Sequence, residues 1–180
     1  MEYRILRSSR KTLTLQITPE GEVLVRCPNR MPKWQVQQFV DSKADWIHTH
    51  LQKIAARPAA PKLTAQELKA LAKQAAEDIS KRAARFAPLV GVSYGSITIR
   101  AQRTRWGSCT GKGNLNFNCL LMLAPEEVRD YVVVHELCHR KQMNHSPDFW
   151  AEVEQILPNY RLHKKWLKEN GNSLMARLPD

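Results

Sequence analysis

The sequence lacks several signatures that would place it in a common class. Its four cysteines show no CxxC spacing, so we expect neither a zinc ribbon nor a disulfide framework. The first residues are charged and lack the apolar segment of a secretory signal, and no apolar run approaches the length that spans a bilayer. These absences favour reduced thiols and a cytoplasmic protein without a membrane-embedded part.

Long blocks of like charge are also missing, although the 180 residues carry a formal net charge of +11. Such an excess favours acidic partners, including nucleotides, and weak non-specific binding of nucleic acid is one expectation. A basic protein without any such ligand fits the scattered charges equally well. No GxxxxGK[ST] loop is present to cradle phosphates.

The first third of the chain changes from strand periodicity to helix periodicity. Residues 3–27 alternate apolar and polar side chains around the turn "TPEGE", which predicts a β-hairpin. From Pro32 onward the apolar residues recur at helical spacing. The segment "RPAAPK", residues 57–62, has the composition of a linker. We therefore expect an N-terminal strand-and-helix extension over residues 1–60.

Residues 61–180 have the pattern of a second, larger domain. "TAQE" at 64–67 predicts a capping box that opens a helix, which Pro88 is expected to end. A strand is predicted at 96–102. The order of strands, helices, strands and helices along the chain predicts an α+β fold with a small antiparallel sheet packed on helices.

The segment "NLNFNCL", residues 114–120, alternates asparagines with apolar residues. One face is apolar and the other carries amides, as expected of a strand at a sheet edge. After Pro125 a helix is predicted to run to about residue 143. Ser146 and Pro147 then have the character of an N-cap and a first helical residue.

The strongest chemical signal is "HELCH", residues 135–139, on this predicted helix. Residues four apart on a helix differ by about 40° in direction and about 6 Å in height, so His135 and His139 share one face. Two imidazoles so placed can bind one tetrahedral Zn²⁺, although nickel or another divalent metal suits them too. Glu136 is placed to act as a general base toward a metal-activated water.

His145, six residues after His139, is the candidate third metal ligand. The chain must reverse direction after the helix to bring it back, and Asn144 is the residue expected to supply a left-handed conformation there. Glu154 is the alternative third ligand. The competing interpretation is that His145 merely packs at the start of the next helix.

Two motifs make the sequence resemble a known family. "RWGSC" at 105–109, together with "HELCH" and "NHSPDFW", is similar to the YgjP-like metal-dependent hydrolases, described as zinc metallopeptidases, and more distantly to SprT-like and Wss-type proteases. The resemblance also covers the opening "KTLTLQITPEGEVLVRCP" and the tail "LPNYRLHKKWL". It implies a zincin-like catalytic domain over 61–180, with one zinc ion held by His135, His139 and His145.

The resemblance also suggests which residues contact substrate. An edge strand before the motif helix pairs with extended peptides in zincins, and such pairing uses unpaired backbone groups of a sheet edge. Asn116 and Asn118 lie on the strand expected to do this. Arg105 is a candidate for an anionic group, and Trp106 for either the site wall or packing. Tyr160 is a candidate oxyanion donor, with Arg161 and His163 as alternatives.

Three functions remain open from the sequence. The first is a zinc-dependent metallopeptidase with Glu136 as general base, acting on a peptide or protein substrate. The second is a metal-dependent nucleoside triphosphate pyrophosphatase, which the positive charge would assist. The third is a DNA-associated protease or a nucleic-acid-associated module with structural zinc. Three histidines and no evident fourth ligand favour an open, catalytic metal site.

Overall fold

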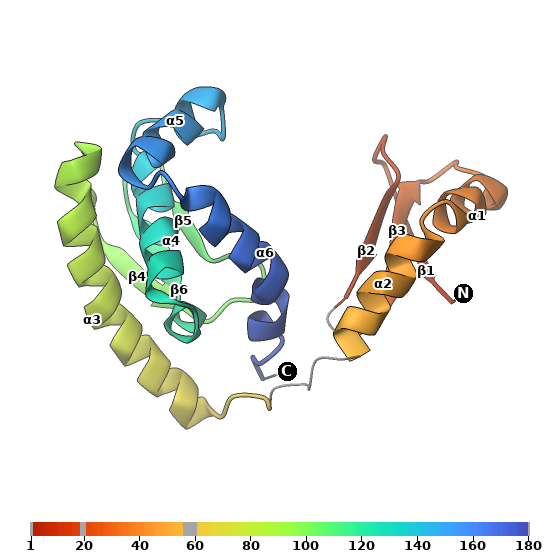
Figure 1. Cartoon of the computed structure of the whole chain (residues 1–180), viewed down its shortest axis with the longest axis horizontal. Coiled ribbons are helices and arrows are strands. Elements are labelled where there is room, and N and C mark those ends of the chain that lie inside the picture. Colours follow the sequence, from red (N-terminus) through yellow and green to blue (C-terminus); the bar gives the residue numbers. More distant parts are fainter. Residues whose placement is uncertain (1, 19–20, 56–60, 180) are drawn as a thin grey trace. The chain divides into compact units, whose positions relative to one another are not determined.

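A computed structural model describes residues 2–18, 21–55 and 61–179, in two compact units, Met1–Ala59 and Ala60–Asp180 (Figure 1). The predicted linker at 57–62 falls largely outside the described residues. All four cysteines are free thiols. No helix in the described ranges is long and apolar enough to cross a membrane.

The smaller unit is a three-stranded sheet with two helices. Its strands are β1 (Arg4–Ser8), β2 (Thr14–Ile17) and β3 (Val23–Pro28), in the order β1-β3-β2. Strands β2 and β3 pair antiparallel, which agrees with the predicted hairpin, whereas β1 pairs parallel with β3. Alternate residues of β3 are buried with residues of the helices α1 (Lys33–Asp41) and α2 (Ala44–Ala55), because the side chains of a strand alternate between its faces.

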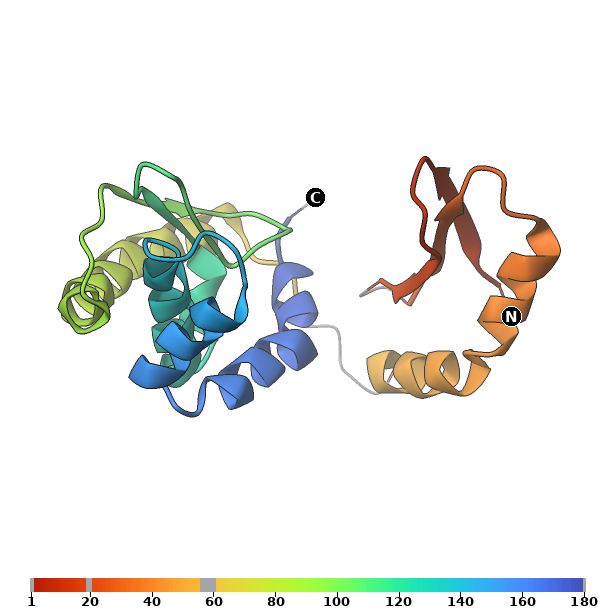
Figure 2. The same cartoon turned by 90° about the horizontal axis from the view of Figure 1, so that it is seen from above.

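The larger unit is built around the helix α4 (Glu126–Cys138). The long helix α3 (Ala65–Val90) contacts one side of α4, and α5 (Pro147–Ile156) and α6 (Tyr160–Met175) contact it elsewhere (Figures 1 and 2). A short 3₁₀ segment, η1 (Cys119–Leu123), precedes α4. Six α-helices and two small sheets in the described residues make the fold α+β.

Both ends of α3 follow from local sequence. Thr64 Oγ1 accepts a hydrogen bond from the Glu67 amide at 3.2 Å, and the Glu67 carboxylate accepts one from the Thr64 amide at 2.7 Å, so the predicted capping box is confirmed. The prediction that Pro88 ends the helix is wrong. Proline removes one hydrogen bond, but the last turn still closes, and Gly91 ends the helix in the left-handed conformation with φ +77°.

The sheet of the larger unit is mixed, and the predicted antiparallel arrangement is wrong. Its strands are β4 (Ile97–Arg100), β5 (Gly107–Cys109) and β6 (Leu115–Asn118), in the order β4-β6-β5. Strand β4 pairs parallel with β6, and β5 pairs antiparallel with it. Periodicity within a strand does not determine which strands pair, so this order was not visible in the sequence.

The prediction that residues 114–120 form an edge strand is also wrong, because β6 is the central strand. The "RWGSC" segment contributes β5 along one side of it. The polar side chain of Asn116 in β6 forms hydrogen bonds with residues of the two neighbouring strands. Asn116 Nδ2 donates to Ser108 Oγ at 3.3 Å, and Asn116 Oδ1 accepts from Arg100 Nε at 3.3 Å.

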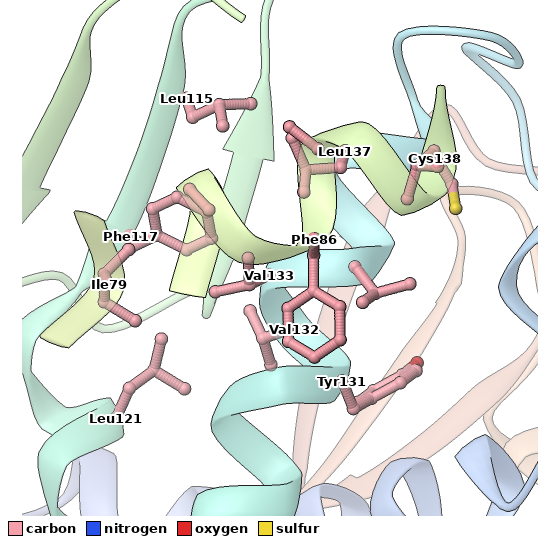
Figure 3. Close-up of a cluster of buried hydrophobic side chains, with 14 of the residues drawn as sticks. Ile79, Phe86, Leu115, Phe117, Leu121, Tyr131, Val132, Val133, Leu137 and Cys138 are labelled. Carbon is pink, nitrogen blue, oxygen red and sulfur yellow. The ribbon is translucent and has the colours of Figure 1, made fainter. Parts of the chain in front are cut away.

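The core of the larger unit lies between this sheet and the helices α3 and α4. Leu115 and Phe117 of β6 are completely buried, and Figure 3 shows them facing side chains of both helices. The contacting residues include Ile79, Phe86, Val132, Val133 and Leu137. Burial of each such side chain stabilises the fold by roughly 1.5–3 kcal/mol. This packing therefore holds α4 in a defined position against the sheet.

An ionic network fastens α3 to α4 at the edge of this core. Arg82 of α3 pairs with Asp78 at 2.7 Å and with Asp130 of α4, and its side chain is 11% exposed. Arg129 of α4 pairs with Asp78 at 3.4 Å. Arg85 reaches Asp130 at 3.0 Å but is largely exposed. The network gives the two helices a fixed axial position.

The chain ends of the larger unit lie beside one another. The Leu63 amide donates to the Arg177 carbonyl at 2.7 Å, and Lys62 Nζ donates to the Leu178 carbonyl at 3.1 Å. Leu63 and Leu178 are buried together with Leu120. The last residues of the unit are therefore attached to the segment that precedes α3.

Candidate metal centre

The C-terminal end of α4 brings two histidines to one side. His135 lies in the last turn and His139 is the C-cap residue, with ring centroids 4.9 Å apart. The predicted helix end near residue 143 is wrong, since α4 ends at Cys138. The amides of Lys141 and Gln142 both donate to the Cys138 carbonyl at 3.0 Å, which turns the chain away from the helix axis.

The chain reversal that follows returns His145 to the same place. Every described non-glycine residue has negative φ, so Asn144 does not adopt the left-handed conformation expected of it. The chain reverses without any left-handed residue, and α5 begins two residues after His145. Ser146 caps α5 by accepting from the Phe149 amide at 3.3 Å, with Pro147 as the first helical residue, as the sequence predicts.

A buried phenylalanine supports all three imidazoles. The ring centroid of Phe149 lies 4.9 Å from His135, 4.5 Å from His139 and 4.9 Å from His145. Phe149 is completely buried, so its ring is held in place and gives the histidines a rigid apolar surface to pack against. Sequence reasoning missed this residue. The sequence feature that could have identified Phe149 is its position three residues after the N-cap Ser146. A side chain at that position in α5 points back toward α4.

The three histidines offer nitrogen atoms at metal-binding separation. One ligand atom from each of His135, His139 and His145 lies within 4.8 Å of the other two, and Nε2 of His135 and Nε2 of His145 are 3.0 Å apart. Imidazole nitrogens on one tetrahedral zinc, bound at about 2.0–2.1 Å, are about 3.3 Å apart. The donor set therefore fits a tetrahedral ion with a fourth corner free of these three side chains.

The hydrogen bonds of the imidazoles agree with this fit. His139 Nδ1 lies 3.0 Å from the Gln142 carbonyl, and since a carbonyl can only accept, Nδ1 carries the proton and Nε2 keeps a lone pair. The buried Nδ1 of His135 has no hydrogen-bond partner among the described residues. Such an unpaired buried polar atom is costly in a folded protein.

Burial keeps two of the histidines in the form that binds metal. Burial first, and then the charges of His139, His145 and Lys164, together lower the pKa of His135 to about 3. Burial, followed by His139 and Lys164, also lowers the pKa of His145. Neutral imidazoles have the free lone pair that coordination requires.

Glu136 lies beside the histidines in a pocket left open by a glycine. Glu136 is only 5% exposed, and a Cβ added to Gly107 would lie 2.5 Å from its Oε1 atom. Burial raises the pKa of Glu136 to about 8, against the opposing charge of Arg105. The "RWGSC" motif therefore meets "HELCH" directly, because its glycine lets β5 approach the carboxylate.

The residues before β5 are held by Asn118 of β6, and Arg105 and Trp106 point to different surroundings. Asn118 is completely buried and its Nδ2 donates to the carbonyls of Gln102 and Arg105, at 2.6 and 3.1 Å, so it holds the loop. The side chain of Arg105 is exposed, and its charge acts against the raised pKa of Glu136. Trp106 packs into the apolar core and against Gly171 of α6, which agrees with the packing interpretation.

The candidates on α5 and α6 form an aromatic wall next to the histidines. Tyr160 is buried and stacks on Trp150 with centroids 5.3 Å apart, and Trp150 in turn stacks on His145 at 5.6 Å. Glu154 pairs with Arg161 at 2.6 Å, so that its carboxylate is already engaged. Within the described ranges, the group able to hold a metal consists of the three histidines.

Comparison with known proteins finds a family whose model matches this chain, and solved structures that match part of it. The family described as "YgjP-like, metallopeptidase domain" matches residues 11–70 and 61–170. No curated protein sequence matches significantly. Among solved structures, the metallopeptidase zymogen of Pyrococcus abyssi abylysin is 23% identical with a TM-score of 0.47, over 56% of this chain and 99% of that one. The metallopeptidase zymogen of Methanocaldococcus jannaschii jannalysin is 21% identical with a TM-score of 0.43, over 50% and 91%.

Proposed function

This chain belongs to the YgjP-like metallopeptidase family, and from that premise we propose that it is a zinc-dependent peptidase whose ion is held by His135, His139 and His145. The observation that carries the proposal is the convergence of three imidazole nitrogens within 4.8 Å beside a buried glutamate. The family implies a divalent metal, and zinc is the ion that suits three nitrogen ligands in a tetrahedral site. The catalytic unit is residues 61–180, with a zincin-like core, and residues 1–60 form an extension.

When bound, the metal supplies Lewis acidity toward water and the substrate carbonyl. The Glu136 carboxylate accepts a proton from the attacking water and returns it to the leaving amine. Its burial against Gly107 keeps competing water away from it. Phe149 and the Gln142 carbonyl hold the imidazoles in the required orientation.

The substrate is proposed to bind along β5. This strand lies at the outer side of the sheet, so one side of its backbone is not paired with another strand. An extended peptide that adds there by β-pairing passes Gly107, and hence Glu136. Arg105, exposed in the segment just before this strand, is proposed to contact the substrate. Asn116 and Asn118 support β5 and its preceding loop from β6.

Metal analysis combined with a peptidase assay tests the proposal. Purified protein is expected to carry one zinc ion per chain and to cleave casein or short peptides. Glu136→Gln should keep the zinc and lose at least about a hundredfold in kcat, because general-base catalysis typically contributes that much. His135→Ala/His139→Ala should lose the zinc, whereas the control His48→Ala, which removes an exposed imidazole of the smaller unit, should keep both properties. Full zinc occupancy in the double variant would disprove the ligand assignment.

A further inference from the structure

We propose that Lys164 is a specificity-determining residue that binds an oxyanion group of the substrate at the metal centre. This inference rests on the proposed function, which places the cleaved bond of the substrate at the three histidines. It adds that the preferred substrates carry a carboxylate or a phosphate close to that bond.

The position of Lys164 follows from the aromatic wall of α5 and α6. Its Nζ lies 3.8 Å from the ring centroid of Trp150, and that ring lies 5.6 Å from His145 and 5.7 Å from His135. Cation–π contact is strongest with an indole and favours this position of the flexible side chain. The ammonium group therefore lies over the same indole ring that contacts the two histidines.

The charge of Lys164 lies close to the histidines. Its ammonium group contacts the Trp150 ring, and among the described residues no carboxylate forms an ion pair with it. Neighbouring Arg161, by contrast, is paired with Glu154 at 2.6 Å. Lys164 remains exposed and available to an incoming group.

A cation in this position opposes the binding of a divalent metal by the same histidines. The arrangement becomes favourable once an anionic group of the substrate lies between the ammonium group and the metal centre, because a charge-assisted hydrogen bond then replaces repulsion. The shared chemistry is that of an oxyanion. Its sources are an acidic side chain or free C-terminus of a peptide, or the phosphates of a nucleotide.

Matched substrates distinguish these sources. Wild type, Lys164→Gln and Lys164→Arg are compared on peptides that differ in one Asp or Asn near the cleaved bond, on free-acid and amidated peptides, and on a nucleoside triphosphate. Lys164→Gln should raise KM for the acidic member of a pair at least about tenfold with little change in kcat, and leave the neutral member unchanged. Lys164→Arg should restore most of the preference.

The matched control is Lys165→Gln, which makes the same change in net charge on an adjacent exposed position of α6. It should change neither KM. A second readout does not depend on turnover: Lys164→Gln should bind zinc about fivefold more tightly than wild type, because a nearby like charge is removed, and Lys165→Gln should not. Unchanged zinc affinity in Lys164→Gln would overturn the placement.

The outcomes separate this inference from the proposed function. If peptides are not cleaved but the triphosphate is, in a Lys164-dependent manner, the peptidase proposal fails and the oxyanion site stands, with phosphate as its source. If nothing is cleaved, titration of the zinc-loaded protein with N-acetylglutamate and with inorganic pyrophosphate decides the inference. Equal affinity of wild type and Lys164→Gln for both probes, or equal loss of activity on acidic and neutral peptides, would refute it.

Discussion

Two residues without reactive groups determine the geometry of the centre. Gly107 admits the carboxylate of Glu136, and Phe149 supports the rings of the three histidines. Neither residue can hold a metal or move a proton. Their contribution is to orient the groups proposed to do so, and such orientation is frequently as sensitive to mutation as the reacting groups themselves.

Gly107→Ala is expected to reduce activity while zinc remains bound. The new Cβ would lie 2.5 Å from Glu136 Oε1, and its three nearest heavy atoms all belong to Glu136, so the carboxylate is the group that must move. We expect a loss of at least about tenfold in kcat and about 1–3 kcal/mol of stability from the overpacking. Gly111→Ala is the control, because nothing lies within 4 Å of its added Cβ. Equal effects of the two substitutions on kcat would contradict this reading of the site.

Phe149→Leu is expected to weaken zinc binding specifically. The smaller side chain removes ring contacts from all three imidazoles, which then sample more orientations before coordination. Phe117→Leu is the matched control, since Phe117 is equally buried but belongs to the core around β6. Both variants should lose stability, by about 1–2 kcal/mol. Competition with a zinc chelator should show a lower affinity in Phe149→Leu alone.

At the scale of elements, the position of α4 depends on contacts at both of its ends. Its last turn carries the centre, while its second turn carries Asp130, which is held to α3 by Arg82. Between them lie the buried valines and Leu137 that face the sheet. A shift of α4 along its axis would separate Glu136 from Gly107, so the ionic network contributes to the site from a distance.

Arg82→Met is expected to destabilise the larger unit by about 2–3 kcal/mol, since it leaves two poorly exposed carboxylates without their main partner. Arg85→Met removes a partner of Asp130 from a side chain that is 60% exposed, and should cost less than about 1 kcal/mol. Urea unfolding monitored by circular dichroism measures both values.

The stabilisation by Arg82 should also depend on pH. Burial alone would raise the pKa of Asp78, but the hydrogen bonds and charges of Arg82 and Arg129 outweigh it and hold the pKa below its ordinary value of 3.8. A lowered carboxyl pKa gives stability that is present above the ordinary value and is lost as pH falls through the folded-state value. The stability difference between wild type and Arg82→Met should therefore narrow below about pH 4. A constant difference from pH 7 to pH 3 would exclude Asp78 as its source.

Local features of this fold were predictable from the sequence, and pairing between distant segments was not. The capping box at Thr64 and the N-cap at Ser146 depend on residues three positions apart, so the sequence states them directly. The proximity of His135 and His139 follows from helix geometry alone. The central place of β6 depends on β5, whose three residues show no strand periodicity. The Arg82 network joins charges almost fifty positions apart, which no local pattern reveals.

At the scale of the whole chain, each unit has a hydrophobic core of its own. The buried residues of the smaller unit centre on Val25, Val36 and Ile47, and the larger unit has separate clusters around Phe117 and Leu120. Each proposed function resides in the larger unit. A core that is complete within one segment allows that segment to fold alone.

A chain of residues 61–180 is accordingly expected to fold and to bind zinc. It should unfold in a single cooperative transition and carry one zinc ion per chain, with an affinity within about threefold of the full-length protein, because all its proposed ligands and their supports are retained. Thermal unfolding and metal analysis of the two proteins check this. Aggregation or loss of zinc in the shorter chain would show that residues 1–60 are needed for the fold of the larger unit.

The order of the elements along this unit can be changed, because Leu63 is hydrogen-bonded to Arg177 and Lys62 to Leu178. Its two ends are neighbours, so a short glycine-serine connection can join them, and new termini can be opened in the exposed turn at Gly111. A circular permutant made in this way keeps every contact of the histidines while reversing the order in which β6 and α3 are synthesised.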